Sequence, residues 1–116
     1  MSDVDLESCE EVKRWFKGAG YDSAPEAERR QLISELGAFC RFADMTPRQL
    51  IDSCLRTTKE GHTAISTKGR RAMQQSIDAF VAERGLAGHQ SIAAGNRIRS
   101  FLVHNGVFIQ GRAAIH

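Results

Sequence analysis

The chain has 116 residues, of which 41% are hydrophobic and 26% are charged, and its formal net charge is +2 at pH 7. This composition excludes a disordered or collagen-like chain, and the length suits one domain with a single core rather than a two-domain enzyme. Helix-favouring residues are frequent and only two prolines occur, which favours helix over sheet. No stretch approaches the roughly 18 consecutive apolar residues of a membrane span, and the acidic N-terminus is unlike a secretion signal, so we expect a cytoplasmic location and no membrane partner.

The small net charge conceals two halves of opposite sign. Residues 1–45 contain ten acidic and six basic residues, for a net charge of −4, whereas residues 46–116 contain four acidic and ten basic residues, for a net charge of +6. An uneven distribution of this kind points to an anionic partner for the basic half.

The first two of five predicted helices follow from apolar periodicity and from residues that cap or end a helix. The first spans about residues 5–17 and ends at Gly18 and Gly20. The second begins at Ser23, because the spacing from Ser23 to Glu26 is that of a capping box. Apolar residues at helical spacing make it a long core helix: Leu32, Ile33, Leu36, Phe39, Cys40 and Ala43.

The start of the third helix is the best-defined boundary in the sequence. Thr46 and Gln49 have capping-box spacing, Pro47 takes the first helical position, and the apolar pattern continues to Leu55. Residues 57–66 lack periodicity, and we expect them to form a mobile loop.

The fourth and fifth helices are both bounded by glycine. The fourth begins near Thr67 and ends before Gly85, whose place suits a residue just beyond a helix end. The fifth follows Gly88 and ends at Asn105 and Gly106, a pair that favours a left-handed cap.

A helical projection of the fifth helix assigns its faces. Asn96, Arg97 and Ser100 are expected on the solvent face, with Arg99 beside the core stripe. The segment 107–109 that follows is either a strand-like extension or a packing arm.

No catalytic or metal-binding motif is present in the sequence. Phosphate-binding loops and nucleophile elbows are absent. The histidines are too far apart for a helical or finger-type metal site: His62, His89, His104 and His116. Three cysteines, none in a C-x-x-C pair, are expected to be buried free thiols: Cys9, Cys40 and Cys54. We therefore expect a binding protein with no cofactor and no metal.

Lys68, Arg70 and Arg71 fall in the first turn of the fourth helix. Cations oppose the helix dipole there, at a cost of a few tenths of a kcal/mol each, roughly. They are either a site for DNA phosphates or a solvated surface.

Polar side chains also open the fifth helix. His89, Gln90 and Ser91 are followed by further residues able to contact base edges or phosphates, namely Asn96, Arg97 and Arg99. The alternative is that the first three only cap and solvate the helix.

Several short segments, in this order, carry a family resemblance. After a helix that contains Trp15 come residues 39–42 (FCRF), 45–51 (MTPRQLI), 79–81 (AFV), 98–101 (IRSF) and 105–107 (NGV). The set resembles the core-binding domain of tyrosine recombinases and phage-type integrases, over most of residues 10–109. The resemblance implies a SAM-like, all-α bundle of four to five helices that grips the core recombination site beside a separate catalytic domain.

The resemblance also implies which helices meet DNA, namely the second, from Ser23, and the fifth, from His89. Related sequences often have Thr and Tyr early in the second helix, where Glu28 and Leu32 stand here, and a glutamate there would repel phosphate. The family's catalytic residues are absent, since Tyr21, the only tyrosine, lies near the start. The resemblance therefore implies no enzymatic activity for this chain.

We thus expect residues 1–116 to form a single helical domain, monomeric in isolation, that binds double-stranded DNA and does not catalyse recombination. It would be a fragment of an integrase or a stand-alone remnant of one, since this length leaves no room for the catalytic domain. The expected DNA-binding residues are Lys68, Arg70, Arg71, His89, Gln90, Ser91, Asn96, Arg97 and Arg99. The main alternative is a helical protein-interaction module with no DNA role; an enzyme would need a deep pocket lined by titratable groups.

Overall fold

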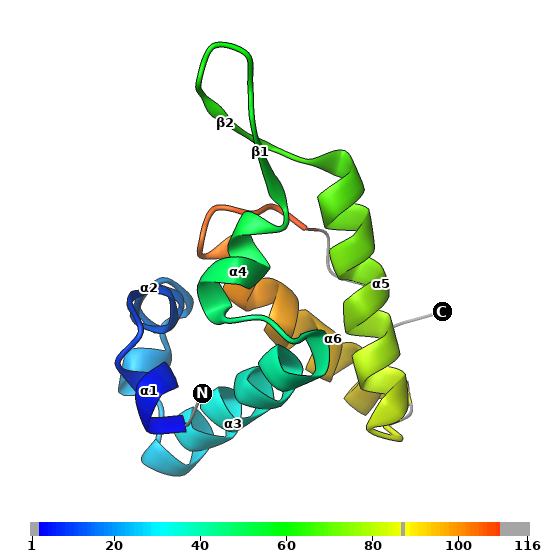
Figure 1. Cartoon of the computed structure of the whole chain (residues 1–116). Coiled ribbons are helices and arrows are strands. Elements are labelled where there is room, and N and C mark those ends of the chain that lie inside the picture. Colours follow the sequence, from blue (N-terminus) through cyan, green and yellow to red (C-terminus); the bar gives the residue numbers. More distant parts are fainter. Residues whose placement is uncertain (1–2, 87, 110–116) are drawn as a thin grey trace.

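The computed structural model describes residues 3–86 and 88–109 (Figure 1). Its helices in this part of the chain are α1 (Asp3–Glu7), α2 (Glu10–Ala19), α3 (Glu26–Ala43), α4 (Pro47–Asp52), α5 (Thr67–Glu83) and α6 (Gly88–Val103). A 3₁₀ turn, η1 (Tyr21–Ser23), precedes α3, and an antiparallel hairpin, β1 (Leu55–Thr57) and β2 (Thr63–Ile65), precedes α5. The predicted mostly helical bundle is confirmed, with more helices than the four to five expected.

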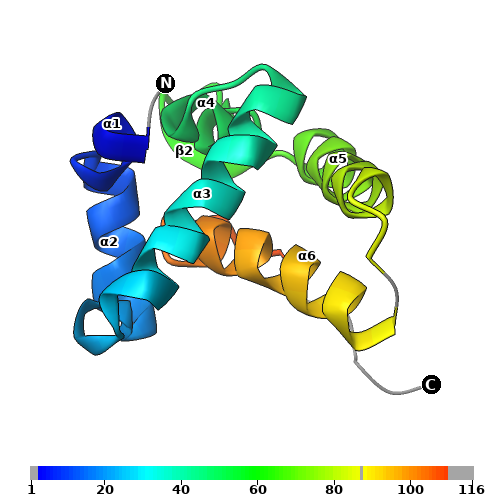
Figure 2. The same cartoon turned by 90° about the horizontal axis from the view of Figure 1, so that it is seen from below.

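Helix α6 lies at the centre of the bundle. It packs against α2 on one side and α5 on the other, while α3 crosses over it and contacts α1 and α5 (Figure 2). Trp15 of α2 is buried against Phe101 of α6, with the ring planes at 86° and the centroids 5.6 Å apart. The indole nitrogen of Trp15 donates to the hydroxyl oxygen of Ser100, at 3.1 Å. Since each fully buried large apolar side chain contributes about 1.5–3 kcal/mol, such contacts fix α6 in place.

The first predicted helix is two helices, so that prediction is corrected. The chain is extended at Cys9, which separates α1 from α2. Leu6 and Trp15 are both almost completely buried. At about 100° per residue they would lie on opposite faces of one straight helix, and the break lets both reach the core. Helix α2 then passes through Gly18 and ends before Gly20, which has a left-handed backbone (φ 79°).

The capping box predicted at Ser23 is wrong. Ser23 belongs to η1, its hydroxyl donates to the carbonyl of Gly20, and α3 begins at Glu26. The cause is Pro25, because a residue that precedes proline is disfavoured in helical backbone. Ala24 is accordingly extended (φ −73°, ψ 155°).

The boundary predicted at Thr46 is confirmed in detail. The backbone nitrogen of Gln49 donates to the Thr46 hydroxyl, and the Gln49 side chain accepts from the backbone nitrogen of Thr46. Helix α4 ends at Asp52, before the expected Leu55. The predicted start of α5 at Thr67 is also confirmed.

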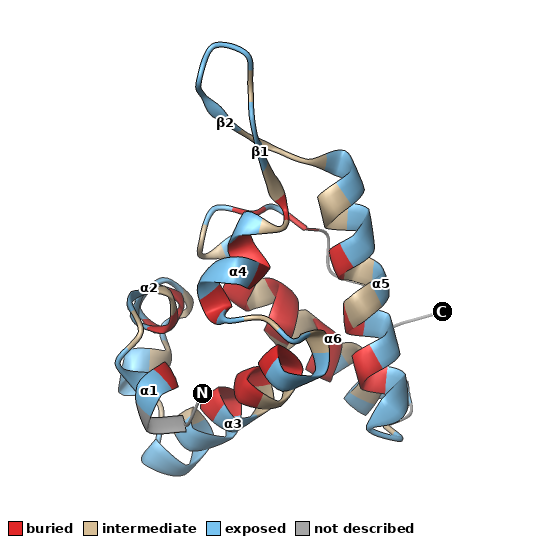
Figure 3. Cartoon of the chain, viewed as in Figure 1, coloured by how far each residue is buried: buried red, intermediate tan, exposed pale blue. Residues whose placement is uncertain are grey.

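Residues 57–66 are not the expected loop, because most of them belong to the β1–β2 hairpin. Arg56 pairs with Ala64 and Thr57 with Thr63. The strands have only three residues each, too few for an alternating pattern to show in the sequence. The hairpin is exposed, while buried residues line the inward faces of the helices (Figure 3).

The segment after α6 is a packing arm, which decides between the two alternatives. Val107 and Ile109 are buried, whereas Phe108 between them is 63% exposed. As far as the chain is described, this segment joins no strand.

The thiols of Cys40 and Cys54 are buried and free, as predicted, and that of Cys9 is half-buried. Burial raises the pKa of the Cys40 thiol to about 11. The thiol is therefore protonated at neutral pH and is a poor nucleophile.

None of the helices in the described ranges is both long enough and apolar enough to cross a membrane.

Candidate nucleic-acid interface

The residues predicted to bind DNA lie in three separate places. Lys68, Arg70 and Arg71 are among the first five residues of α5, and His89, Gln90 and Ser91 are in the first turn of α6. The remaining three, Asn96, Arg97 and Arg99, are in the middle of α6. Helix α5 is about 25 Å long at a rise of about 1.5 Å per residue, and the first two groups lie near its opposite ends (Figure 1).

Arg99 is not on the surface, and its predicted contact with DNA is corrected. It is 3% exposed. Its guanidinium donates to Gln74 at 2.8 Å, to Asn96 at 3.0 Å and to Asp78 at 3.3 Å. A Cβ added at Gly95 would lie 2.7 Å from an Arg99 nitrogen, so a glycine at 95 makes room for the guanidinium. Arg99 joins α6 to α5 inside the protein.

Arg97 is also engaged within the fold. It makes two hydrogen bonds to the carboxylate of Glu35 on α3, at 2.6 and 2.9 Å. The Glu35 side chain is only 12% exposed, and its hydrogen bond to the guanidinium raises the pKa of Arg97. The charge of Arg97 is therefore neutralised by Glu35, and Arg97 joins α6 to α3.

The expected solvent face of α6 is wrong for the same reason. Asn96, Arg97 and Ser100 are all half-buried, because α6 packs against α2 and α5 and is joined to α3 through Arg97 and Glu35. Asn96 accepts from Arg99, and Ser100 accepts from Trp15. A projection that assumes one buried face fails for a helix with neighbours on several sides.

The start of α6 retains exposed polar residues. His89 and Gln90 are exposed and Ser91 is half-buried. Within the described residues no hydrogen bond occupies these three side chains, so they make no capping bond there and are available for an external contact.

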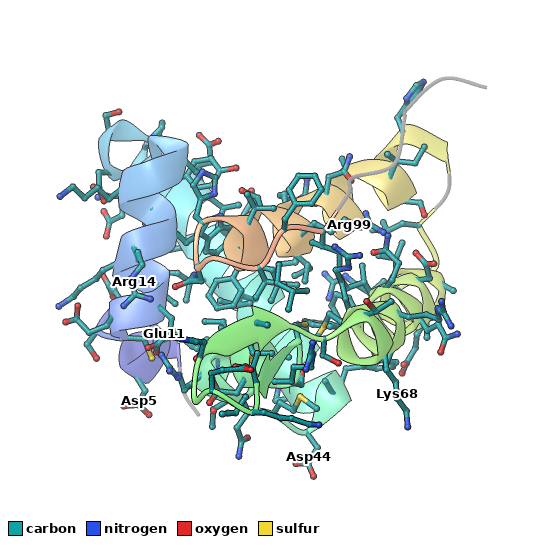
Figure 4. All side chains as sticks on the ribbon, turned by 90° about the horizontal axis from the view of Figure 1, so that it is seen from above. Asp5, Glu11, Arg14, Asp44, Lys68 and Arg99 are labelled. Atoms are coloured by element: carbon teal, nitrogen blue, oxygen red, sulfur yellow. The ribbon has the colours of Figure 1, made fainter. Side chains whose placement is uncertain are left out.

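The start of α5 carries accessible positive charge. Lys68 and Arg71 are exposed, and the half-buried Arg70 donates to the carbonyl of Phe108 at 3.3 Å. None of the three pairs with a carboxylate in the part of the chain that the structure describes. Figure 4 shows Lys68 extending outward from α5, on the side away from Asp5 and from α1.

The helix start is held rigidly. The Ser66 hydroxyl accepts from the backbone nitrogen of Gly69 at 2.9 Å, and the backbone nitrogen of Ser66 donates to the carbonyl of Cys54 at 2.8 Å. A Cβ at Gly69 would overlap the carbonyl oxygen of Ser53, so this turn of α5 lies directly against the end of α4. The backbone that carries these cations is therefore fixed in position.

Two further exposed cations are not among the residues predicted to bind DNA. Arg56 and Lys59 are exposed on the hairpin, immediately before α5 in the chain. Residues 53–72 contain five basic residues and one acidic residue, Glu60, for a net charge of +4. We call this surface the basic edge and define it by the cations Arg56, Lys59, Lys68, Arg70 and Arg71. The sequence signal for them is a run of bases that begins well before Lys68, in a segment predicted to be a loop.

Over the described ranges, no three histidine, cysteine, aspartate or glutamate side chains are placed to hold a metal ion. The exposed large hydrophobic residues among those described are on three different elements: Phe42 on α3, Val103 on α6 and Phe108 on the arm.

Comparison of the chain with models of protein families, with curated proteins and with solved structures finds no match.

Proposed function

We propose that this chain is a non-catalytic double-stranded DNA-binding domain, of the core-binding type that its sequence resembles, which grips DNA beside a separate recombinase catalytic domain. The observation that carries the proposal is the basic edge, whose five cations have no carboxylate partner among the described residues. The cytoplasmic location expected from the sequence is compatible with this role.

The electrostatics of the basic edge favour a polyanionic partner. Lys68, Arg70 and Arg71 stand at the positive end of the α5 dipole, which costs a few tenths of a kcal/mol each, roughly, and they also repel one another. Arg97, by contrast, is matched by the carboxylate of Glu35. DNA phosphates would supply the missing negative charge, and release of their counterions would drive binding.

The start of α6 supplies a second set of contacts in this proposal. His89 and Gln90 are exposed there, near the other end of the 17-residue α5. A separation of about 25 Å corresponds to about seven base pairs at about 3.4 Å each. In this proposal one duplex lies along α5 and meets both groups, with phosphate contacts at Lys68 and Arg71 and base contacts at Gln90.

The competing role, a protein-interaction module, lacks a corresponding feature. Among the described residues, the exposed large apolar side chains are those of Phe42, Val103 and Phe108, which is few for a docking patch of several hundred Å², roughly.

Fluorescence anisotropy of a labelled 20-base-pair duplex tests the proposal. Three to five phosphate contacts predict a plot of log K against log salt with a slope of roughly −3 to −4.5. An unchanged anisotropy at low salt, up to several hundred micromolar protein, would refute DNA binding.

A further inference from the structure

The β1–β2 hairpin projects from the helical bundle (Figure 1). Only its base is packed, where Leu55 and Ile65 are half-buried, and Arg56, Thr57 and the tip are largely exposed. Hairpins of this size are marginally stable alone, so its shape is imposed by the chain on either side.

The hairpin is nevertheless ordered by hydrogen bonds at both ends. At the tip, the backbone nitrogen of Thr58 donates to the carbonyl of His62 at 2.7 Å, and the His62 nitrogen donates to the Thr58 hydroxyl at 3.1 Å. At the base, the bond from Ser66 to Cys54 fixes its direction against α4. The result is a two-stranded ribbon held at a set angle to α5.

The two faces of the ribbon carry different chemistry. Arg56 stands beside the small Ala64 on one face, so its long side chain meets no bulky cross-strand neighbour. Thr57 and Thr63 stand together on the other face and offer two hydroxyl and two methyl groups. Lys59 and His62 are exposed at the tip.

We propose that this hairpin enters the major groove of duplex DNA, with Arg56 and Lys59 on phosphates and the threonine face toward the bases. The inference rests on the proposed function and adds to it a second element that contacts the bases, distinct from the helices. Phosphates and base edges accept hydrogen bonds from arginine and lysine. Threonine can hydrogen-bond to base edges through its hydroxyl and contact the thymine methyl group through its own methyl group.

The dimensions decide between the grooves. Two strands lie about 4.8 Å apart, so with side chains the ribbon fits a groove about 12 Å wide but not one about 6 Å wide. The four steps from Leu55 to Lys59 near the tip reach at most about 13 Å, which exceeds the major-groove depth of about 8.5 Å.

The test compares two double variants of the full chain that remove equal charge. Arg56→Ala with Lys59→Ala changes the hairpin. Lys17→Ala with Arg41→Ala is the control, because both are exposed, lie outside the basic edge and pair with no described carboxylate. Both variants should keep the wild-type circular dichroism and melting temperature.

The hairpin variant should bind the labelled duplex about tenfold or more weakly, and its salt slope should be smaller by about 2. The control should bind within about twofold of the wild type. Methyl green, which occupies the major groove, should compete with the wild-type protein more strongly than netropsin, which occupies the minor groove, and the hairpin variant should lose most of this difference.

Each negative result refutes a different proposal. If the wild-type protein does not bind the duplex, the proposed function is wrong. If it binds and the hairpin variant matches the control, DNA is bound without the hairpin and this inference is wrong. Stronger competition by netropsin than by methyl green would overturn the choice of groove.

Discussion

The cations at the start of α5 and those in the middle of α6 belong to the same residue types, and both groups were predicted to face DNA. Lys68 and Arg71 are exposed and have no acidic partner among the described residues. Arg97 and Arg99 are held by Glu35 and by a set of α5 and α6 side chains. The difference follows from position in the bundle, because α5 lies at its edge and α6 lies between three other helices. A basic residue on a helix is a candidate for DNA only after the packing of that helix is known.

Arg99→Ala should give the largest loss of stability and tests whether the arginines in the middle of α6 are structural. The change removes the donor shared by Gln74, Asn96 and Asp78 and leaves a cavity. We expect a loss of about 3 kcal/mol in the free energy of unfolding, measured by urea denaturation. Arg71→Ala, the matched change at an exposed site, should stay within about 0.5 kcal/mol. Equal stability of the two variants would contradict the buried role of Arg99.

Gly69→Ala tests how firmly the basic edge is held. An alanine inside a helix is normally more stable than glycine by about 1 kcal/mol. Here the new methyl group would overlap the carbonyl oxygen of Ser53, so the sign should reverse to a loss of about 2 kcal/mol. A raised melting temperature would show that α5 does not lie against the end of α4.

Lys68→Ala with Arg71→Ala tests whether the exposed cations at the start of α5 bind DNA. Folding stability should be unchanged or higher by a few tenths of a kcal/mol, roughly, because both side chains are exposed and oppose the helix dipole. Affinity for duplex DNA should fall about tenfold, irrespective of base sequence, and the salt slope should decrease by about 2. The control is again Lys17→Ala with Arg41→Ala, and equal losses in both variants would remove the special role of this site.

Arg97→Ala should give the smallest effect. It leaves the carboxylate of Glu35, 12% exposed, without its partner. Because Arg97 itself is 39% exposed and water can reach the pair, the expected loss is about 1 kcal/mol. Thermal unfolding of Arg97→Ala and Glu35→Gln should show similar losses, and a double variant should lose less than the sum of the two.

Local signals in the sequence predicted one helix start correctly and another wrongly. The capping box at Thr46 involves residues three apart, and it was predicted correctly. The box at Ser23 failed because Pro25 restricts the residue before it, a local effect that was overlooked.

Tertiary contacts and short strands account for the other errors. The break at Cys9 exists because Leu6 and Trp15 must both be buried in one core. Glu35 is 62 residues from Arg97, so periodicity along α6 alone could not reveal the ion pair. The strands of the hairpin are too short for their pattern to be recognised, and the cations on it were missed with them.

Trp15 is the only tryptophan in the chain, and its burial against Phe101 and Ser100 has a practical consequence. It lies on α2, across the bundle from α5 (Figure 2). Its fluorescence should therefore report the docking of α2 on α6 and be insensitive to a ligand held at α5. Trp15 fluorescence can therefore show whether the protein stays folded, and it can be measured on the same sample during an anisotropy titration of labelled DNA.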